Sequence, residues 1–359
     1  MQKIDNTNNF IPSPNQGKND FYGLGIAPKI LDTLERLKFK VPMPIQRKAI
    51  PLAIQGKDII GIAQTGTGKT HSFAIPIIQH LALGKGTALV LAPTRELAVQ
   101  IDEAFQGLAK PFGMRTSCLI GGALMNPQIQ ALRRNPRVVI ATPGRLMDHI
   151  WRSNILLDDI VVLVLDEADR MLDMGFIQDM KFMMSLMPKD RHTLFFSATM
   201  SRDVESLIKV FLRDPISISV KTGDTPKSVD QDIVKTRGRN KIDVLHDLLS
   251  GAEFKKVLVF GRTKHGVEKL SKILTERGFK AESIHGNKNL SKRRHALTLF
   301  KDNHIQVLVA TDVAARGLDI IGVSHVINYD LPATYDDYVH RIGRTGRGSK
   351  KGKALTFVE

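Results

Sequence analysis

The feature of this sequence that most constrains its fold is a regular alternation of short apolar runs with amphipathic stretches. The apolar runs have the length of β-strands, and some are apolar at every position, as in VVLVL at Val161–Leu165. The stretches between them repeat apolar residues at helical spacing, as in Glu96–Leu108. Strands that alternate with helices are typical of a parallel sheet that is covered by helices on both faces. We therefore expect an α/β fold.

A polar segment divides this alternation into two halves. Residues 221–227 read KTGDTPK, and the Gly and Pro within this polar run are typical of a linker. We expect one domain at residues 21–220 and a second at residues 228–359, because a chain of 359 residues has the length of two ordinary domains. Residues 1–20 are rich in Asn, Pro and Lys, which predicts a disordered tail.

The apolar runs and the periodic stretches predict individual elements. The expected strands of the first half are Asp58–Ala63, Ala88–Ala92, Ser117–Ile120, Val138–Ala141, Val161–Leu165 and Thr193–Ser197, and those of the second half are Lys256–Phe260, Ala281–Ile284, Gln306–Ala310, His325–Asn328 and Ala354–Val358. The clearest expected helices are Glu96–Leu108, Gln128–Arg134, His265–Arg277 and Ser291–Lys301.

The chain carries a large excess of positive charge. Its 52 Lys and Arg residues exceed its 36 Asp and Glu residues, which gives a formal net charge of +16. Basic surfaces bind polyanions because counterions are released from the phosphate backbone. Composition alone leaves RNA, DNA and anionic lipid open as partners, and a solvated basic face without any partner is the alternative.

Cysteine content and hydropathy indicate the compartment. Cys118 is the only cysteine, so an intrachain disulfide is impossible, which is typical of a reducing cytosol. No stretch of the sequence is long and apolar enough to span a bilayer. We expect a cytoplasmic protein without a membrane partner.

A phosphate-binding loop is predicted at AQTGTGKT, residues Ala63–Thr70, between an apolar strand and an amphipathic helix. Gly66 and Gly68 would let backbone N–H groups approach phosphates, and the helix N-terminus adds a positive dipole end. Lys69 would supply a charge for the β- and γ-phosphates, and Thr70 would offer a hydroxyl to Mg²⁺. The general motif begins with Gly, whereas this chain has Ala63. The alternative is a Gly-rich turn without a ligand.

A second candidate site follows the apolar strand Ile160–Leu165, which ends in the carboxylates of Asp166, Glu167 and Asp169. Ligands of parallel sheets bind at the carboxyl ends of the strands. Charges that follow so apolar a strand are expensive to bury without a cation or hydrogen-bond partners. We therefore predict that Asp166 holds Mg²⁺ and that Glu167 polarises an attacking water. The alternative is a solvated strand-to-helix turn.

Several further motifs follow one another along the chain. They are PTRELA at Pro93–Ala98, TPGRL at Thr142–Leu146, DEAD at Asp166–Asp169, SAT at Ser197–Thr199, ATDVAARGLDI at Ala310–Ile320 and HRIGRTGR at His340–Arg347. By these motifs and the phosphate-binding loop, which cover the chain from Phe21 almost to its end, it resembles a DEAD-box RNA helicase. HGNK at His285–Lys288 is most similar to the bacterial RhlE-type subgroup.

The resemblance implies a fold, an activity and ligands. The implied fold is two tandem RecA-like domains, each a parallel β-sheet flanked by helices, joined by a short flexible linker. The implied activity is that of an ATP-dependent RNA helicase: hydrolysis of ATP with Mg²⁺, stimulated by RNA and coupled to domain closure, local unwinding of short duplexes and RNP remodelling. The implied partner is RNA, bound by its backbone without sequence preference, and the implied oligomeric state is a monomer.

The resemblance also assigns residues to the nucleotide. FKVPMPIQ at Phe39–Gln46 resembles the adenine-reading motif of the family, in which Phe39 would stack on the base and Gln46 would read its edge. The set implied for ATP, Mg²⁺ and catalysis in this way is Phe39, Gln46, Thr65, Gly66, Thr67, Gly68, Lys69, Thr70, Asp166, Glu167 and Asp319, the last at the ribose.

Further roles are implied for both halves. Arg344 and Arg347 match the arginine fingers of the family, which stabilise the charge that develops on the γ-phosphate. Fingers on the other domain make hydrolysis depend on closure. The residues implied to couple the nucleotide to closure are Asp169, Ser197, Thr199 and His340, and those implied to contact RNA are Thr94, Arg95, Gly122, Thr142, Arg145, Arg293 and Thr311.

The sequence departs from the family pattern at three positions. Lys38 replaces the usual Gly, and Met43 replaces the usual Thr, which removes a hydroxyl with an expected capping role. Leu290 replaces the usual Gln three residues before Arg293, which predicts the loss of one hydrogen bond to RNA. Two other functions stay open: an ATP-gated RNA clamp or annealing factor with little strand separation, and a motor directed to DNA.

Overall fold

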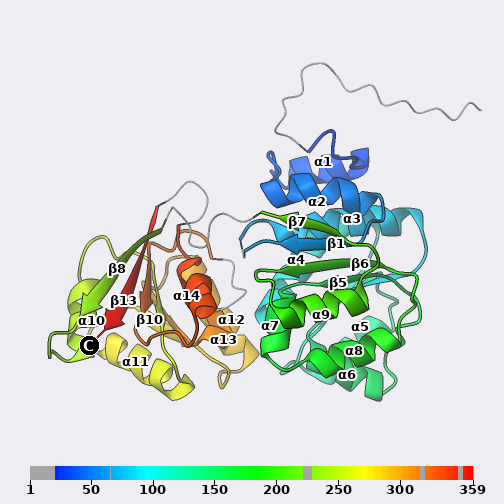
Figure 1. Ribbon diagram of the computed structural model, residues 1–359. Coiled ribbons are helices and arrows are strands. Elements are labelled where there is room, and N and C mark those ends of the chain that lie inside the picture. Colours follow the sequence, from blue (N-terminus) through cyan, green and yellow to red (C-terminus); the bar gives the residue numbers. More distant parts are fainter. Residues whose placement is uncertain (1–20, 65, 221–228, 316–319, 347–350, 359) are drawn as a thin grey trace, which may run out of the picture.

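The computed structural model describes residues 21–64, 66–220, 229–315, 320–346 and 351–358. These residues form two units, each built on one parallel sheet (Figure 1). The first sheet has seven strands in the order β3-β4-β2-β5-β6-β1-β7, and the second has six strands in the order β10-β11-β9-β12-β13-β8. The expected α/β fold with two tandem parallel sheets is therefore confirmed.

The elements of each unit follow in chain order. The first unit contains α1 (Pro28–Arg36), α2 (Pro44–Ile54), β1 (Ile59–Ile62), α3 (Lys69–Leu83), β2 (Thr87–Leu91), α4 (Arg95–Ala109), the 3₁₀ turn Lys110–Phe112, β3 (Thr116–Leu119), α5 (Met125–Leu132), β4 (Val138–Ala141), α6 (Pro143–Trp151), β5 (Ile160–Leu165), α7 (Ala168–Asp173), α8 (Ile177–Ser185), β6 (His192–Ser197), α9 (Arg202–Phe211) and β7 (Ile216–Ser219). The second unit contains β8 (Val229–Lys235), α10 (Lys241–Leu249), β9 (Val257–Phe260), α11 (Lys264–Glu276), β10 (Ala281–Ile284), α12 (Leu290–Lys301), β11 (Val307–Ala310), α13 (Asp312–Ala315), β12 (His325–Asn328), α14 (Tyr335–Ile342) and β13 (Gly352–Val358).

Every strand that the sequence predicts is present, with bounds that differ by at most two residues. Two strands were not predicted, β7 and β8, and each forms an edge of its sheet. An edge strand needs apolar side chains on only part of its surface, and most residues of β8 (VDQDIVK) are exposed. The sequence of β8 therefore lacks the continuous apolar run by which the inner strands are recognised.

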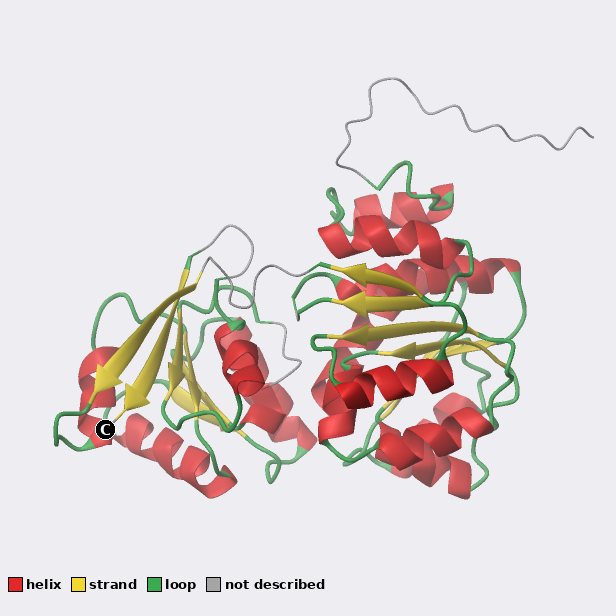
Figure 2. Ribbon diagram, viewed as in Figure 1, coloured by secondary structure: helices red, strands yellow, loops and turns green. Residues whose placement is uncertain are grey.

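The inner strands are apolar at every position because both faces of the sheet are covered. In β5, Val162 and Val164 belong to one buried cluster of the first unit, whereas Leu163 and Leu165 belong to another. Successive side chains of a strand point to opposite faces, so these clusters lie on the two sides of the sheet. Helices lie on both sides of the sheet in Figure 2.

The strands of the first unit position the loops that follow them. The arrows of the first sheet point toward the second unit, so the carboxyl ends of its strands face that unit (Figure 2). The predicted phosphate-binding loop follows β1, and Asp166 and Glu167 follow β5. The edge of the sheet that carries the candidate chemistry is thus the edge that meets the other half of the molecule.

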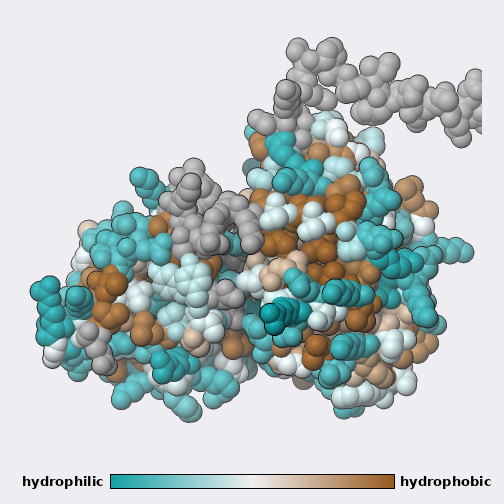
Figure 3. All heavy atoms as spheres, viewed as in Figure 1, coloured by the Kyte–Doolittle hydropathy of each residue, from teal (hydrophilic) through white to brown (hydrophobic). Residues whose placement is uncertain are grey.

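The two units differ in the hydropathy of the surface that is visible in Figure 3. Hydrophilic residues cover most of the visible surface of the second unit, whereas apolar residues gather on the near side of the first unit (Figure 3). None of the helices in the described ranges is long and apolar enough to cross a bilayer. The predicted tail, residues 1–20, and the predicted linker, residues 221–227, lie outside the described residues.

A glycine in β1 provides a test of packing in the first unit. A Cβ atom at Gly61 would lie 2.5 Å from Cδ1 and 2.6 Å from Cε1 of Phe196, whose ring is fully buried. We predict that Gly61→Ala lowers the free energy of unfolding of this unit by about 1–3 kcal/mol, because overpacking forces the ring to move. Urea unfolding monitored by circular dichroism would measure the change.

Gly84 provides the matched control. It lies at the C-cap of α3 with φ of −131°, and the nearest atom to its Cβ position is His80 O at 3.7 Å. Gly84→Ala should leave the unfolding midpoint nearly unchanged. Equal midpoints for Gly61→Ala and Gly84→Ala would contradict the packing argument.

Candidate functional site

The predicted phosphate-binding loop lies between β1 and α3, and its shape depends on two glycines. Gly66 and Gly68 have φ of +80° and +85°, in the left-handed region that favours glycine. A Cβ atom at Gly68 would lie 2.5 Å from Gln46 Nε2 and 2.8 Å from Met43 Sδ. The loop therefore packs closely against the segment Phe39–Gln46, and a side chain at Gly68 would have to displace the ends of the Gln46 and Met43 side chains from a backbone conformation that favours glycine.

Lys69 and Asp166 are buried beside each other, at the start of α3 and the end of β5. Lys69 Nζ lies 3.8 Å from Asp166 Oδ1, and the two side chains are 6% and 3% exposed. Lys69 Nζ has no hydrogen-bond partner among the described residues. Burial raises the pKa of the Asp166 carboxyl to about 6, although the charge of Lys69 opposes this shift. Such a pair is costly to keep unless a ligand supplies negative groups to the lysine and a cation to the carboxylate.

The oxygen donors at this point fit Mg²⁺. Asp166 and Thr70 both line the same cavity, and they offer a carboxylate and a hydroxyl. No group of three or more His, Cys, Asp or Glu side chains in the described part of the chain could hold a metal on its own. Mg²⁺ typically binds one or two protein oxygens together with substrate phosphates and water. The residues present therefore fit a magnesium ion that arrives with a nucleotide.

Glu167 has a strained backbone next to this pair. Its φ and ψ are +52° and +51°, in the left-handed region, and it stands at the N-cap of the short helix α7. A non-glycine residue in this region costs of the order of 1–3 kcal/mol, and such strain is concentrated at active sites. The Glu167 side chain is buried and lines the same cavity as Lys69 and Asp166.

The segment that resembles an adenine-reading motif closes the cavity on one side. Gln46 Oε1 accepts a hydrogen bond from the Met43 N–H at 2.8 Å, and Gln46 Nε2 donates to Gly68 O at 3.0 Å. Gln46 therefore supplies a cap at the start of α2, where Met43 has no hydroxyl, and it also fixes the phosphate-binding loop. The Phe39 ring lies 4.4 Å from that of His71, whose pKa is lowered by burial.

The cavity that these residues line has a volume of about 590 Å³ and is bounded by both units. The first unit contributes Phe39, Gln46, Lys69, Asp166 and Glu167, among others, and the second unit contributes Lys301 and Ile321. A ligand in this cavity would touch both halves of the chain. Its affinity would therefore depend on their relative position.

Asp169 links the DEAD segment to the SAT segment. Its Oδ2 atom accepts hydrogen bonds from the Ala198 N–H and the Thr199 N–H at 3.0 Å and from Thr199 Oγ1 at 3.1 Å. Ser197 Oγ donates to Thr199 O at 2.8 Å. The three residues of the first unit that were expected to couple the nucleotide to closure are thus in contact.

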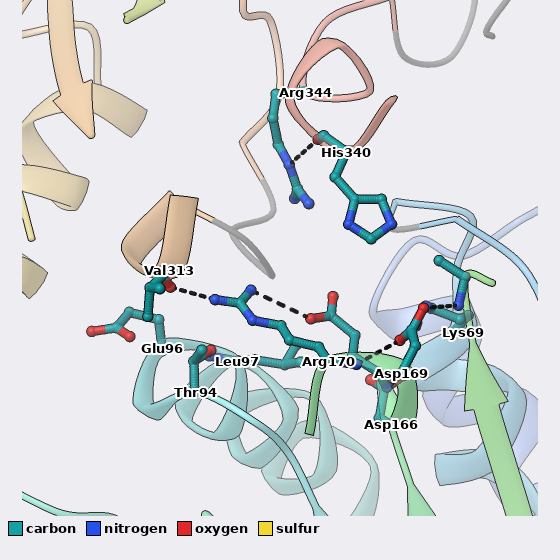
Figure 4. A network of polar contacts seen from close by, with 12 residues as sticks. Lys69, Thr94, Glu96, Leu97, Asp166, Asp169, Arg170, Val313, His340 and Arg344 are labelled. Carbon is teal, nitrogen blue, oxygen red and sulfur yellow. Dashed lines mark hydrogen bonds and ion pairs between the residues drawn. The ribbon is translucent and has the colours of Figure 1, made fainter. Parts of the chain in front are cut away.

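The candidate finger Arg344 lies on the second unit, just after α14. Its side chain and that of His340 point toward the end of β5 and the start of α7, where Asp166 and Asp169 lie (Figure 4). Arg344 is buried, and its Nε donates to His340 O at 3.2 Å. The structure therefore brings Arg344 and His340 to the side of the second unit that faces the cavity.

An ion pair that the sequence did not predict holds α14 in place. Arg341 donates to both oxygens of Asp312, from Nε at 2.6 Å and from Nη2 at 2.8 Å. Arg341 Nη1 also donates to Asp330 O at 2.6 Å, and the side chain is buried. This bidentate pair joins α13 to α14 and fixes the position of one helix relative to the other. The only signal of this ion pair in the sequence was Arg341 itself, the first arginine of HRIGR.

Arg293 makes an ion pair that the sequence did not predict. Its Nη2 donates to Glu96 Oε2 at 2.6 Å, with both side chains buried, and its predicted contact with RNA stays a prediction. Glu96 belongs to α4 of the first unit, so this is an ion pair between the units. Leu290, on the same helix as Arg293, packs against the apolar core of the first unit. The departure at Leu290 thus exchanges a polar side chain for an apolar contact between the units.

A second contact between the units begins at Arg170, directly after the DEAD segment. Arg170 Nη2 donates to Val313 O of α13 at 2.5 Å, and Arg170 Nη1 lies 3.8 Å from Glu167 Oε2 (Figure 4). The Arg170 side chain is 3% exposed. The sequence alone did not indicate this contact, because the side chain of an arginine that follows an acidic segment is ordinarily exposed to solvent.

Most residues predicted to bind RNA in the first unit lie together. A Cβ atom at Gly122, where φ is +74°, would lie 2.2 Å from Arg95 Nη1, so the Arg95 guanidinium covers this glycine. Arg145 Nη1 donates to Ala123 O at 3.0 Å in the same loop. Thr94 and Thr142 are the N-caps of α4 and α6.

The remaining predicted site residues are Thr311, Thr65, Asp319 and Arg347. Thr311 is buried at the end of β11, in the second unit. Thr65, Asp319 and Arg347 lie outside the described residues, so their predicted contacts with ATP stay predictions.

Comparison with protein families gives two matches in chain order. Residues 43–207 match the model of the DEAD/DEAH box helicase, and residues 240–349 match that of the helicase conserved C-terminal domain. The first match contains the phosphate-binding loop and the DEAD segment, and the second contains α12 to α14. Together they span both units.

Curated relatives and solved structures agree with this result. The chain is 46% identical over 342 residues to the ATP-dependent RNA helicase CshA of Listeria monocytogenes, covering 94% of this chain and 66% of that protein. The chain thus spans about two thirds of the length of this relative. The curated relatives are CshA proteins, so the expected RhlE-type subgroup is not supported.

Two solved structures differ in how well they superpose. Dbp5 of S. cerevisiae bound to RNA and ADP BeF3 is 31% identical, with a TM-score of 0.85, over 95% of this chain and 90% of that one. A DEAD box protein from Methanococcus jannaschii is 38% identical over 95% and 93% of the two chains, but the TM-score is 0.55.

The fold is therefore that of two RecA-like α/β units in the arrangement of a nucleotide- and RNA-bound relative. Their facing edges carry the phosphate-binding loop, the DEAD segment and Arg344. By its family matches and its relatives, this chain belongs to the DEAD-box family of ATP-dependent RNA helicases.

Proposed function

We propose that the chain hydrolyses ATP in the cavity between its two units, that RNA stimulates this hydrolysis, and that closure of the units on ATP and RNA locally unwinds short duplexes. The observation that carries this proposal is the cavity of about 590 Å³ lined by both units, in which Lys69 Nζ is buried without an acceptor. A triphosphate would provide the missing acceptors. Because ATP and RNA each stabilise the closed state, each would raise the affinity for the other.

In this proposal the phosphates lie on the loop Ala63–Thr70, and Asp166 and Thr70 hold Mg²⁺. Bound Mg²⁺ would neutralise charge on the phosphate oxygens. Asp166 would hold Mg²⁺ as a carboxylate, so Mg²⁺ would compete with the proton that Asp166 binds at low pH because of its raised pKa. Phe39 and Gln46 would contact the adenine, together with Asp319 at the ribose.

Glu167 is proposed as the general base. Water attacks the γ-phosphorus, the bond to the bridging oxygen of ADP breaks, and the Glu167 carboxylate accepts the water proton. Arg344 and Arg347 of the second unit would stabilise the negative charge on the transferred group. Hydrolysis would then require that the second unit is docked.

RNA is proposed to cross the first unit along the loop that contains Gly122. Arg95 and Arg145 contact this loop. Thr94 and Thr142 belong to the same two motifs, PTRELA and TPGRL, to which the resemblance assigns contacts with RNA. Guanidinium groups, hydroxyls and backbone N–H groups suit contacts with phosphate and sugar rather than bases. We propose that the protein acts on RNA in the cytoplasm, as a monomer, without sequence preference.

Removal of the proposed base separates binding from turnover. We predict that Glu167→Gln binds ATP normally but lowers RNA-stimulated phosphate release roughly 10²- to 10⁴-fold, which is the range for a general base. The measurement is multiple-turnover phosphate release at saturating RNA, with nucleotide affinity measured separately. Glu205→Gln, on the exposed start of α9, is the control. Normal turnover by Glu167→Gln would exclude this residue as the base.

The nature of the nucleic acid is tested by stimulation of the ATPase. We predict that single-stranded RNA stimulates phosphate release more strongly than single-stranded DNA of the same sequence at the same salt concentration, because contacts to the sugar distinguish the 2′-OH. Stronger stimulation by DNA would instead indicate a DNA motor. Binding of RNA without multiple turnovers would indicate an ATP-gated clamp.

The ion pair between Arg293 and Glu96 is predicted to stabilise the closed state. Breaking a buried pair costs about 3 kcal/mol or more, and this pair joins two units, so Arg293→Met should weaken RNA binding with ADP BeF3 roughly 10²-fold. Glu96→Gln should have a similar effect, and the exchange Glu96→Arg with Arg293→Glu should restore part of the loss. If only Arg293→Met weakens binding, Arg293 contacts RNA directly and the pair is incidental. RNA titration by fluorescence anisotropy measures all four proteins.

A further inference from the structure

Arg170 touches both the proposed base and the opposite unit. Its Nη1 atom lies 3.8 Å from Glu167 Oε2, and its Nη2 atom donates to Val313 O at 2.5 Å. Figure 4 shows the Arg170 guanidinium reaching toward Val313 of the second unit.

The position of Val313 is tied to that of the arginine finger. Val313 belongs to α13, and its neighbour Asp312 is held by both ends of the Arg341 guanidinium, at 2.6 Å and 2.8 Å. Arg341 is in α14, three residues before Arg344. The Val313 carbonyl and Arg344 are therefore parts of one body, so that docking of Val313 on Arg170 occurs together with docking of Arg344 at the cavity.

The burial of Arg170 makes its orientation depend on this contact. The side chain is 3% exposed, and a guanidinium that is shielded from water needs acceptors in fixed directions. The Val313 carbonyl provides one of them from the second unit. When the units separate, this acceptor is lost and the guanidinium has no fixed direction from that side.

Glu167 has its own need for a positioning group. Its backbone lies in the left-handed region with φ of +52°, and the short helix α7 that follows holds only Ala168–Asp173. A general base must hold its carboxylate within hydrogen-bond distance of the attacking water, and a displacement of 1 Å lowers the rate of a catalysed step about 10²-fold. Arg170, one helical turn after Glu167, places a positive charge 3.8 Å from its carboxylate.

We propose that Arg170 is a positioning residue that orients Glu167 only when the second unit has docked. In the closed state the Val313 carbonyl fixes the guanidinium, and the guanidinium directs the Glu167 carboxylate into the cavity. In the open state Arg170 no longer orients the Glu167 carboxylate. The proposal rests on the proposed role of Glu167 as base, and it gives closure two effects on hydrolysis, one through Arg344 and one through Arg170.

The test compares Arg170→Met with Arg170→Lys. Methionine keeps most of the apolar volume but has no charge and no donor, so kcat at saturating ATP and RNA should fall about 10²-fold, with KM for ATP changed less than threefold. The ratio of RNA-stimulated to RNA-free rates should fall about tenfold. Lysine retains a charge that reaches one partner at a time, so Arg170→Lys should recover part of kcat.

Three controls make the outcome specific. Arg202→Met, at an exposed arginine at the start of α9, should match the parent protein. RNA affinity in ADP BeF3 measures closure, and Arg170→Met should keep it within a few fold, unlike Arg293→Met. Glu167→Gln measures the base itself, so normal turnover of that variant would reject the proposed function rather than the role of Arg170.

Specific results would overturn the role of Arg170. An unchanged kcat for Arg170→Met would show that Glu167 does not need it. A large rise in KM for RNA with unchanged kcat would show that Arg170 only clamps the units together. If Arg170→Met does not fold, an Arg170→Lys protein with the parent kcat and the parent stimulation ratio would equally reject the proposal.

Discussion

Lys69 and Asp166 bury opposite charges 3.8 Å apart, and much of the architecture of the first unit serves to hold them there. The lysine is fixed by the glycine turn before α3, and the aspartate by the end of a strand that is apolar on both faces. Without a ligand this pair has no compensation for the water that it has lost. A nucleotide with its metal would provide that compensation. Residues that suit ligand binding therefore lower the stability of the first unit when the cavity holds no ligand.

The two ion or hydrogen-bond contacts described between the units originate near these charges or near the loop proposed to bind RNA. Glu96 follows Arg95 in α4, Arg170 follows the DEAD segment, and the cavity is lined by residues from both halves. The short segments proposed to bind the ligands therefore also contact the other unit. Ligand binding and the relative position of the two units are therefore coupled, because a change in one alters the contacts available to the other.

The fold and the nucleotide site were largely predictable from the sequence, and the reason is physical. Inner strands of a parallel sheet must be apolar throughout, and a phosphate-binding turn must contain glycines, so both leave patterns of fixed spacing. The edge strands β7 and β8 were missed because they obey neither rule. The partners of Arg293 and Arg170 were missed because Glu96 and Val313 are distant in sequence, and no local pattern records which charge will face which acceptor. Arg347, Asp319 and Thr65 stay at the level of resemblance.

The two strands that escaped prediction also lie where the chain passes from one half to the other. It leaves the first sheet by the edge strand β7 and enters the second by the edge strand β8. The strand bonded to β7 is β1, which carries the phosphate-binding loop, so the exit from the first unit is separated from the nucleotide cavity by a single ladder of hydrogen bonds. A displacement of the second unit that pulls on β7 would therefore act first on the strand that positions Lys69.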